Sequence, residues 1–339
     1  MKILVIKQTS LGDVLHSTGH VRAIKHTWPS SELILLTATS SVDIYRHSPW
    51  VDKMIVVDRY RVKHGWYREP AWAWRHMVEV MRQVRSHQFD LAFDLQGLAK
   101  SVVFLYGARA RRKFVKGRWP GLTGFRKPEL HAIEEMDGVL KLGGIEVADT
   151  SMELTTSEAE NDVVASLLRE QNPDGLPVVI LSPFSRWPSK DWPFDYFLQI
   201  ADHLSSQYKV FITGAPDRQQ QIAAGLMQLQ NTAIVSLAGR LNLLEFAALV
   251  KRAQLMLTGD SFPMHVAAAC HTPLIALFGP TDESRVGPRS PMSRVIRAPD
   301  CSRCDRRDCQ RKCLNRILPA TIETVMVESL STYSGSEYQ

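Results

Sequence analysis

The sequence feature that most limits the fold is an alternation between short apolar runs and longer amphipathic stretches. Residues 2–7, 89–94 and 177–182 have the length and apolar character of buried strands. Helical patterns lie between such runs, for example at residues 13–27 and 194–205. Strands that alternate with helices form parallel sheets whose two faces are both covered. We therefore predict an α/β fold.

The alternation weakens near the middle of the chain, which predicts a boundary between two domains. Gly143 and Gly144 precede an acidic, hydroxyl-rich stretch, and the alternation restarts at residue 177. A chain of 339 residues that is 45% hydrophobic can bury two cores. We predict two Rossmann-like domains that face a central cleft with their parallel sheets. They are assigned to residues 1–150 and 151–330, with a disordered polar tail at 331–339.

The charge of the chain favours an anionic partner. The net charge is +6 at pH 7 and the isoelectric point is about 9.1, which suits a nucleotide, a phosphorylated glycolipid, a membrane surface or a nucleic acid. The opening MKILVIK is too short for a signal peptide, and no apolar run has the length of a membrane span. We predict a cytoplasmic protein.

Two polar loops follow predicted strands in the first half. Residues 8–13 follow the first strand and end at Asp13, and residues 94–101 follow the strand at 89–94. The carboxyl ends of parallel strands meet at one sheet edge, so the two loops should form one wall of a cleft. Asp13 is interpreted either as a helix N-cap or as a carboxylate that reaches into that cleft. Neither a GxGxxG fingerprint nor a GK[ST] phosphate loop is present.

Two cationic stretches of the first half stand out. Residues 58–74 interleave basic and aromatic side chains and are predicted to form a loop. That loop could bind an anionic sugar, rest on a lipid surface, stack on single-stranded nucleic acid, or simply cover a hydrophobic edge. Residues 107–118 form a run of cations, interpreted as a solvated face or as a contact for an anionic acceptor or lipid.

The second half concentrates its polar chemistry around residues 255–282. An apolar strand runs into Gly259-Asp260-Ser261, a turn that opens a short helix carrying His265. The start of a helix presents free N–H groups and suits a phosphate. The alternative is an ordinary capped core helix with a satisfied histidine. The loop at 182–193 adds hydroxyls and the cations Arg186 and Lys190, which could neutralise a diphosphate.

Six motifs in this order resemble the bacterial lipopolysaccharide heptosyltransferases of glycosyltransferase family 9. Each motif alone is weakly specific, but together they cover nearly the whole chain. They are SLGDV at 10–14, DLQGL at 94–98 with Lys100 and Ser101, KDWP at 190–193, GAP at 214–216, GDS at 259–261 with His265, and FGPTD at 278–282.

The resemblance implies a GT-B architecture and inverting, metal-independent transfer of a heptose. The donor would be ADP-heptose and the acceptor the Kdo or heptose of the lipopolysaccharide inner core, at the inner face of the inner membrane, with no nucleic-acid partner. Asp13 would be the general base, and Lys190 would stabilise the departing ADP. The resemblance places the donor on Ser185, Lys190, Leu241, Asp260, Ser261 and His265, and the acceptor on Ser10, Gly12, Gln96 and Lys100.

One departure from the family pattern leaves the donor sugar open. The family usually has Thr-Gly after the aspartate of the nucleotide turn, where this chain has Ser261, Phe262 and Pro263. Phe262 cannot give the close backbone approach that glycine allows. A related enzyme with another nucleotide sugar, a non-catalytic nucleotide-sugar-binding protein and a nucleic-acid-binding protein are the alternative interpretations.

Four cysteines lie close together near the carboxyl end, with spacing C-x2-C-x4-C-x3-C. In a cytoplasmic chain this pattern favours a structural zinc site over disulfides, and reduced thiols are the main alternative. Cys270 is predicted to lie in the core. The candidate zinc ligands are Cys301, Cys304, Cys309 and Cys313.

Overall fold

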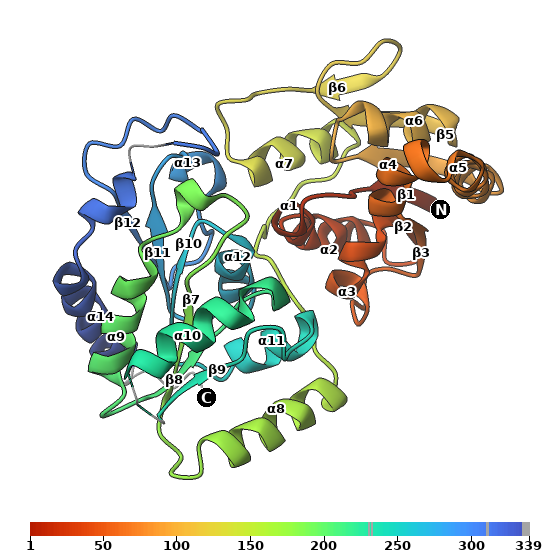
Figure 1. The fold of residues 1–339 in the computed structure, drawn as a ribbon. Coiled ribbons are helices and arrows are strands. Elements are labelled where there is room, and N and C mark those ends of the chain that lie inside the picture. Colours follow the sequence, from red (N-terminus) through yellow and green to blue (C-terminus); the bar gives the residue numbers. More distant parts are fainter. Residues whose placement is uncertain (230, 232, 310–311, 334–339) are drawn as a thin grey trace. The chain divides into compact units, whose positions relative to one another are not determined.

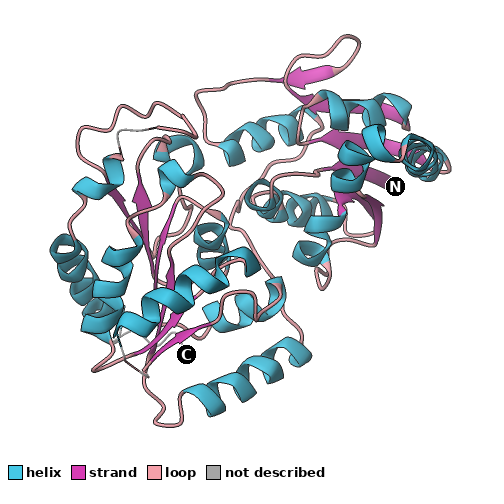
Figure 2. Cartoon of the chain, viewed as in Figure 1, coloured by secondary structure: helices cyan, strands magenta, loops and turns pink. Residues whose placement is uncertain are grey.

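The chain folds into two α/β units, each built on one parallel sheet (Figures 1 and 2). The computed structural model describes residues 1–229, 231, 233–309 and 312–333. The units are Met1–Thr155 and Thr156–Gln339, so the division falls five residues beyond the predicted boundary. The predicted α/β class is confirmed.

The first unit has the strand order β3-β2-β1-β4-β5-β6. The chain starts in the middle of this sheet, builds one side, and returns to build the other. The strand order therefore reverses between β1 and β4. The strands are β1 (Lys2–Ile6), β2 (Glu32–Ala38), β3 (Lys53–Val57), β4 (Gln88–Asp94), β5 (Arg109–Lys116) and β6 (Thr123–Phe125). The helices are α1 (Leu11–Leu15), α2 (Thr18–Thr27), α3 (Val42–Tyr45), α4 (Arg59–Arg68), α5 (Pro70–Arg85), α6 (Ala99–Gly107) and α7 (Ala132–Leu142).

The second unit repeats this plan with the order β12-β11-β10-β7-β8-β9, and its order reverses between β10 and β7. The strands are β7 (Val178–Ser182), β8 (Lys209–Ile212), β9 (Ile234–Ser236), β10 (Leu255–Gly259), β11 (Leu274–Phe278) and β12 (Ser293–Arg297). The helices are α8 (Glu158–Gln171), α9 (Phe194–Leu204), α10 (Gln219–Leu229), α11 (Leu243–Val250), α12 (Phe262–Ala269), α13 (Glu283–Val286) and α14 (Pro319–Tyr333). Short 3-10 turns lie at Pro188–Lys190, Pro216–Arg218 and Cys313–Arg316.

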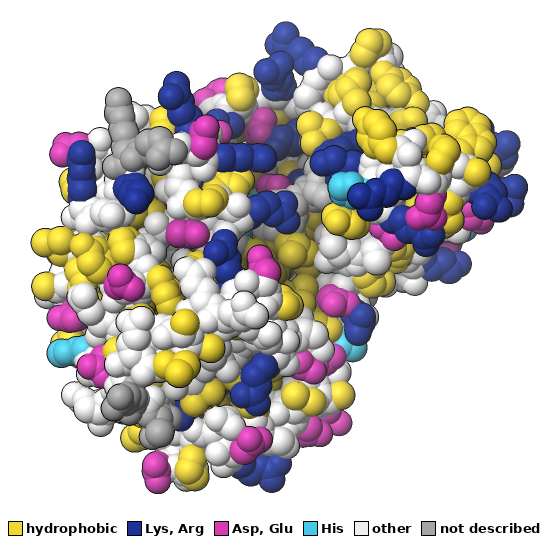
Figure 3. Space-filling view, in the orientation of Figure 1, with side chains coloured by type: hydrophobic (Ala, Val, Ile, Leu, Met, Phe, Trp, Pro, Cys, Tyr) yellow, Lys and Arg dark blue, Asp and Glu magenta, His cyan; other side chains and the backbone are white. Residues whose placement is uncertain are grey.

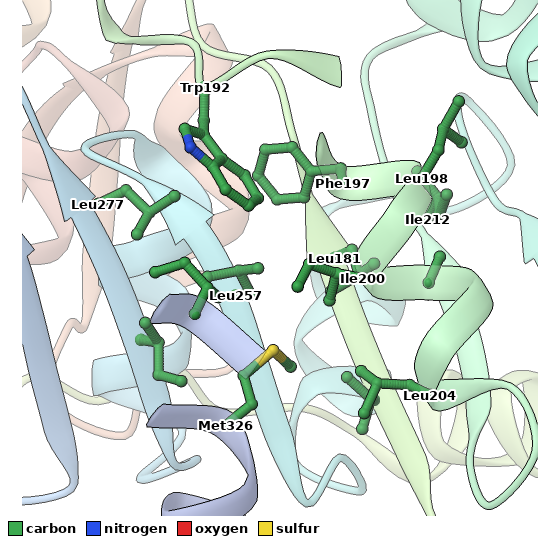
Figure 4. Close-up of a cluster of buried hydrophobic side chains, with 14 of the residues drawn as sticks. Leu181, Trp192, Phe197, Leu198, Ile200, Leu204, Ile212, Leu257, Leu277 and Met326 are labelled. Carbon is green, nitrogen blue, oxygen red and sulfur yellow. The ribbon is translucent and has the colours of Figure 1, made fainter. Parts of the chain in front are cut away.

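Alternate strand residues of the second unit form its main core (Figure 4). Leu181, Leu257 and Leu277 are fully buried beside Phe197 of α9 and Met326 of α14. The strands are apolar on both faces, as expected for a parallel sheet covered by helices. A separate cluster in the first unit gathers residues from β1, β2, β3, α5 and α6. Each unit thus has a core of its own.

The loop predicted at residues 58–74 is wrong, because this stretch forms α4 and the start of α5. The Asp58 side chain accepts a hydrogen bond from the backbone N–H of Arg61 and caps α4. Pro70 occupies the first turn of α5, where its missing N–H costs nothing. The rings of Trp72 and His76, one helical turn apart, stack with their centroids 5.0 Å from each other. Capping and helix-to-helix packing, and not an apolar period, determine this element.

The single helix predicted at residues 13–27 is also wrong, because two helices occupy this stretch. The hydroxyl of Ser17 donates to the carbonyl oxygen of Val14, and that of Thr18 donates to Leu15. Such back-bonding satisfies carbonyls that a continuous helix would use. The helix that contains Asp13 therefore begins earlier than expected, at Leu11, and ends at Leu15.

Two further differences concern polar stretches. The cation run at residues 107–118 contains strand β5, which carries most of its arginines on exposed positions. Helix α14 continues to Tyr333, so the first residues of the predicted tail are helical. The rest of that tail lies outside the described residues. Within the described part of the chain, no helix combines the length and apolar character needed to cross a bilayer.

Candidate active site

The side chain of Gln96 joins the loops that follow β1 and β4. Its Oε1 accepts hydrogen bonds from the backbone N–H groups of Gln8 and Thr9, both at 2.9 Å. Its Nε2 donates to the carbonyl oxygen of Thr9 at 2.8 Å and to the Thr9 hydroxyl at 2.9 Å. These loops lie where the strand order reverses, the position at which open α/β sheets bind ligands. Gln96 is thus part of the frame of this site.

The turn after β4 is held by hydrogen bonds to the Asp94 side chain, and these bonds fix the position of Gln96. Asp94 Oδ1 accepts from the N–H groups of Gln96 and Gly97 at 2.8 and 3.0 Å. Gly97 has φ of +69°, and a Cβ there would lie 1.9 Å from the carbonyl oxygen of Lys116. Burial raises the pKa of Asp94, while the hydrogen bonds from Gly97, Ser101 and Gln96 oppose that shift. Only glycine at position 97 allows this turn to approach the backbone of Lys116 so closely.

Asp13 is the third residue of α1, and the N-cap interpretation of this residue is wrong. The N-cap is Ser10, whose backbone N–H and hydroxyl both donate to Asp13 Oδ2, at 2.9 and 2.8 Å. Two donors on one oxygen hold the carboxylate in a fixed orientation at the sheet edge. Gly12 is buried in the same turn.

Several cations lie near this loop. Lys100 was predicted as an acceptor residue, and Arg59 and Lys63 belong to the basic stretch that was predicted to bind an anionic sugar or a lipid surface. Arg59 donates to the Thr9 hydroxyl at 2.8 Å. Partial burial, together with Arg59 and Lys63, lowers the pKa of Lys100, and Asp13 opposes that shift. Lys7 is 4% exposed, and its Nζ donates to the carbonyl oxygen of Leu95 at 3.2 Å. Burial lowers the pKa of Lys7 to about 8.

In the second unit, Lys190 and Asp260 form a largely buried ion pair. Lys190 Nζ lies 2.6 Å from Asp260 Oδ2, and the two side chains are 15% and 6% exposed. Lys190 follows β7 and Asp260 follows β10, so the pair again marks the reversal of strand order. The hydroxyl of Thr281 donates to the same Asp260 oxygen at 2.6 Å. Thr281 was missed as an individual residue, although it belongs to the recognised FGPTD motif.

The backbone segments that carry Gly259 and Lys190 lie close to each other beside this ion pair. A Cβ at Gly259 would lie 2.9 Å from the carbonyl oxygen of Lys190, so the strand end needs glycine. Lys190 Nζ also lies 4.3 Å from the centroid of the Trp187 ring. The lysine is therefore held by a carboxylate and by an aromatic face.

The remaining predicted donor residues lie at the same edge of the second sheet. Ser261 is the N-cap of α12, and His265 lies one turn into that helix and is 7% exposed. The Ser185 hydroxyl donates to the carbonyl oxygen of Trp187 at 2.8 Å and shapes its own loop. Leu241 is half-buried just before α11, after β9.

The four clustered cysteines are not assembled as a metal centre in this structure. Among the described residues, no group of three or more His, Cys, Asp or Glu side chains is arranged to hold a metal ion. Burial and a hydrogen bond with Cys301 raise the pKa of Cys313 to about 11. The predicted zinc site stays a prediction. Burial raises the pKa of Cys270 to about 12, but its side chain is only partly buried and does not belong to the main core, so the prediction of a core residue is not confirmed.

An open hollow lies at the opposite edge of the second sheet. It has a volume of about 1390 Å³ and is lined by the starts of strands, including Val178, and by Cys270 and Lys251. None of the residues predicted to bind donor or acceptor lines it. The chemistry described above is thus on the carboxyl edge, and this hollow is separate from it.

These features define a two-unit α/β protein with a cluster of polar side chains at the carboxyl edge of each parallel sheet. The model of glycosyltransferase family 9 (heptosyltransferase) matches residues 77–315. The match covers well over half of the chain, so the protein belongs to this family and is a glycosyltransferase.

Similar proteins agree with this assignment. The chain is 21% identical to the lipopolysaccharide core heptosyltransferase OpsX of Haemophilus influenzae, over 87% of this chain and 83% of that one. It is 26% identical to lipopolysaccharide heptosyltransferase 3 of Escherichia coli, over 80% and 81% of the two chains.

Solved structures confirm the GT-B fold. A family 9 glycosyltransferase from Veillonella parvula matches with a TM-score of 0.86 and 21% identity, over 98% of this chain and 97% of that one. The E. coli heptosyltransferase WaaC with ADP matches with a TM-score of 0.78 and 19% identity, over 97% and 100%.

Proposed function

We propose that this glycosyltransferase moves a heptose from ADP-heptose to a Kdo or heptose of the lipopolysaccharide inner core, with inversion at the anomeric carbon. The observation that carries the proposal is the pair of polar sites where each strand order reverses. One holds an oriented carboxylate, and the other holds a buried lysine–aspartate pair beside a helix start. The names of the similar proteins support a heptose donor and a lipopolysaccharide acceptor.

In the proposed mechanism, Asp13 acts as the general base. It takes the proton of the acceptor hydroxyl while that oxygen attacks the anomeric carbon. The new C–O bond forms as the bond from the anomeric carbon to the β-phosphate oxygen breaks. Ser10 orients the carboxylate through its two hydrogen bonds. The geometry supports this role because Asp13 stands at the ligand-binding edge of its sheet.

The departing ADP carries the electron pair of the broken bond on its β-phosphate oxygen. Lys190 stabilises that charge, and Asp260 and Thr281 hold the lysine in place. The N–H groups at the start of α12 offer further donors for the diphosphate, with Ser261 at the N-cap. His265 and Leu241 stand at the same edge and are assigned to the ribose and to the adenine, respectively.

The proposal that the acceptor is anionic is supported by three neighbouring cations, Arg59, Lys63 and Lys100. Their mutual repulsion contributes to the lowered pKa of Lys100, so a bound carboxylate or phosphate would relieve unfavourable interactions. Inner-core sugars of this kind carry carboxylates and phosphates. Together with Ser10, Gly12 and Gln96, these cations form the proposed acceptor site.

We also propose that α4 and α5 rest on the inner face of the inner membrane. Several of their aromatic residues are exposed, including Tyr60 at 79%, Tyr67 at 92% and Trp74 at 63%. Figure 3 shows hydrophobic side chains beside lysines and arginines in the region of these helices. Exposed rings interleaved with cations suit the headgroup layer of an anionic bilayer. This placement would keep the enzyme cytoplasmic and near a lipid acceptor.

The structural zinc ion stays part of the proposal on the strength of the cysteine spacing alone. The test is the metal content of protein purified without chelators, compared with that of Cys304→Ser. Stoichiometric zinc in the wild type and its loss in the variant would support the site.

The experiment that tests the proposed function is a transfer assay with ADP-heptose and a Kdo-bearing lipid acceptor. The product is analysed by mass spectrometry and its anomeric configuration by NMR. Binding of ADP, UDP and GDP is measured in parallel as thermal shifts, because a specific ligand stabilises the folded state. A thermal shift with UDP or GDP alone would show that the donor carries another nucleotide, while the proposed reaction class would stand. Binding of ADP without transfer would contradict the catalytic proposal.

A further inference from the structure

The segment at residues 299–309, here called the cysteine segment, has no part in the proposed chemistry so far. It follows β12 and carries three of the four clustered cysteines together with Arg303, Arg306 and Arg307. Its backbone contacts show where it is held.

The cysteine segment is tied to the loops that surround the Lys190–Asp260 pair. The backbone N–H of Asp305 donates to the carbonyl oxygen of Pro280 at 2.8 Å, in the loop after β11. The Ser189 hydroxyl donates to the carbonyl oxygen of Arg306 at 2.8 Å, in the turn that carries Lys190. Arg297 bridges the carbonyl oxygens of Gly279 and Cys301, both at 3.2 Å. The segment therefore lies along the edge of the proposed donor site.

One side chain of this segment shares an aromatic platform with Lys190. The guanidinium carbon of Arg307 lies 4.8 Å from the centroid of the Trp187 ring, and Lys190 Nζ lies 4.3 Å from the same centroid. Stacking on an indole restricts a long side chain while its N–H groups stay available at the ring edge. Both cations therefore lie against the same ring.

The stacking on Trp187 distinguishes Arg307 from the other arginines of the cysteine segment. Asp260 already compensates Lys190, and Glu283 compensates both Arg297 and Arg303. Within the part of the chain that the structure describes, neither Arg306 nor Arg307 forms an ion pair, and of the two only Arg307 contacts the Trp187 ring. A diphosphate carries more negative charge than one compensated lysine can balance, so the edge needs a further cation. Arginine also offers parallel N–H donors that match phosphate oxygens.

We propose that Arg307 binds the donor diphosphate together with Lys190, and that the cysteine segment is a wall of the donor site. This inference rests on the proposed function, because it takes the loops after β7, β10 and β11 as the place of the nucleotide. Trp187 is the platform that positions both cations.

The test compares Arg307→Gln with Arg306→Gln in the full-length protein. Arg306 is an exposed neighbour on the same segment, so both variants lose one positive charge from the same surface. Calorimetric titration with ADP and with AMP separates diphosphate contacts from nucleoside contacts. We expect Arg307→Gln to lower the affinity for ADP about tenfold or more and the affinity for AMP less than about threefold. Arg306→Gln should change neither by more than about twofold.

Equal losses in both variants would show a general charge effect and overturn the inference. Unchanged ADP affinity in Arg307→Gln, at an unchanged melting temperature, would overturn it as well. UDP, GDP and inorganic pyrophosphate serve as further probes. If the wild type binds UDP and not ADP, the donor assignment fails while the same comparison of variants still tests Arg307. If the wild type binds none of these diphosphates, both proposals fail.

Discussion

At the scale of single residues, the two proposed catalytic groups are held by different means. Asp13 receives two hydrogen bonds on one oxygen from Ser10, at a partly exposed helix start. Lys190 is enclosed by Asp260 and the Trp187 ring. Substitution of Asp13 should therefore lower turnover with little effect on folding stability. Substitution of Lys190 should lower stability as well, because it leaves the buried Asp260 carboxylate without its ion-pair partner.

We expect Asp13→Ala to lower turnover by about 100-fold or more, because a positioned base contributes at least that factor. ADP affinity should stay within about twofold, because Asp13 belongs to the other unit's site. Ser10→Ala is the matched variant: it removes one of the two orienting bonds and should cost about tenfold. Steady-state kinetics and ADP titration provide both numbers. Wild-type turnover in Asp13→Ala would rule out its catalytic role.

Lys7 gives a prediction about pH. Burial lowers its pKa from 10.5 to about 8, Lys116 adds to this effect, and Asp13, Asp94 and Glu135 oppose it. Between these two values the unfolded chain holds a proton that the folded chain has lost. The contribution of Lys7 to the free energy of unfolding therefore rises as pH rises through this window.

Lys7→Met removes this titration. Relative to that variant, the wild type should gain up to about 3 kcal/mol of stability from pH 8 toward about pH 10. Urea unfolding curves of both proteins across this range measure the difference. A difference that does not change with pH would contradict the assignment.

The sequence identified Asp13, Lys190, Asp260 and Gln96 because each follows a strand in a recognisable motif. It did not propose Lys7 or Arg307 for either site, and it placed Arg59 only within a stretch that could bind an anionic sugar. Lys7 looked like the end of an apolar strand, and Arg307 belonged to a run of similar cations. Only the fold shows which of several arginines meets Trp187. The individual roles assigned to the donor and acceptor residues stay predictions.

At the scale of elements, α4 and α5 show where pattern reading fails. Residues 58–74 contain so many cations and rings that no apolar stripe emerges, and we predicted a loop there. The helices form because Asp58 and Pro70 set their starts and because they pack on each other. Strand β5 escaped notice for a related reason, since its exposed arginines break the apolar run typical of buried strands.

The exposed rings of α4 and α5 predict binding to anionic bilayers. Tyr67→Ser combined with Trp74→Ser should reduce sedimentation with phosphatidylglycerol-containing vesicles about tenfold or more, because two large rings leave the interface. Met227→Ser is the control, because this residue of α10 in the second unit is 78% exposed. An equal reduction in the control, or none in the double variant, would argue against α4 and α5 as the membrane surface.

At the scale of the whole molecule, the parallel sheets and the division into two units were the part of the fold that alternation could anticipate, whereas the order of the strands came only from the structure. Short apolar runs separated by helices imply parallel sheets, and two such series imply two units. The observed boundary lies close to the predicted one, in the stretch of described residues between α7 and α8 that contains no strand. The edge strands β6 and β12 were not predicted, since each is short or only half-buried.

The separate cores predict that the second unit folds alone. Within the described residues, the main cluster of this unit and that of the first share no member. A fragment of residues 156–339 should unfold cooperatively and bind ADP within about threefold of the full chain. Circular dichroism during heating and calorimetric titration provide the check. A fragment without a cooperative transition would show that the unit depends on the first one.

This independence has a consequence for how such enzymes diversify. Each half carries its own hydrophobic interior and its own polar edge. Under the proposed function, which assigns the acceptor to the first half and the nucleotide sugar to the second, we expect substitutions that alter acceptor recognition to leave the nucleotide half intact. Exchanging residues 1–155 with the corresponding half of a relative should yield a hybrid with a new acceptor and the old donor. The chain can thus be viewed as two exchangeable parts, each free to acquire a new specificity separately.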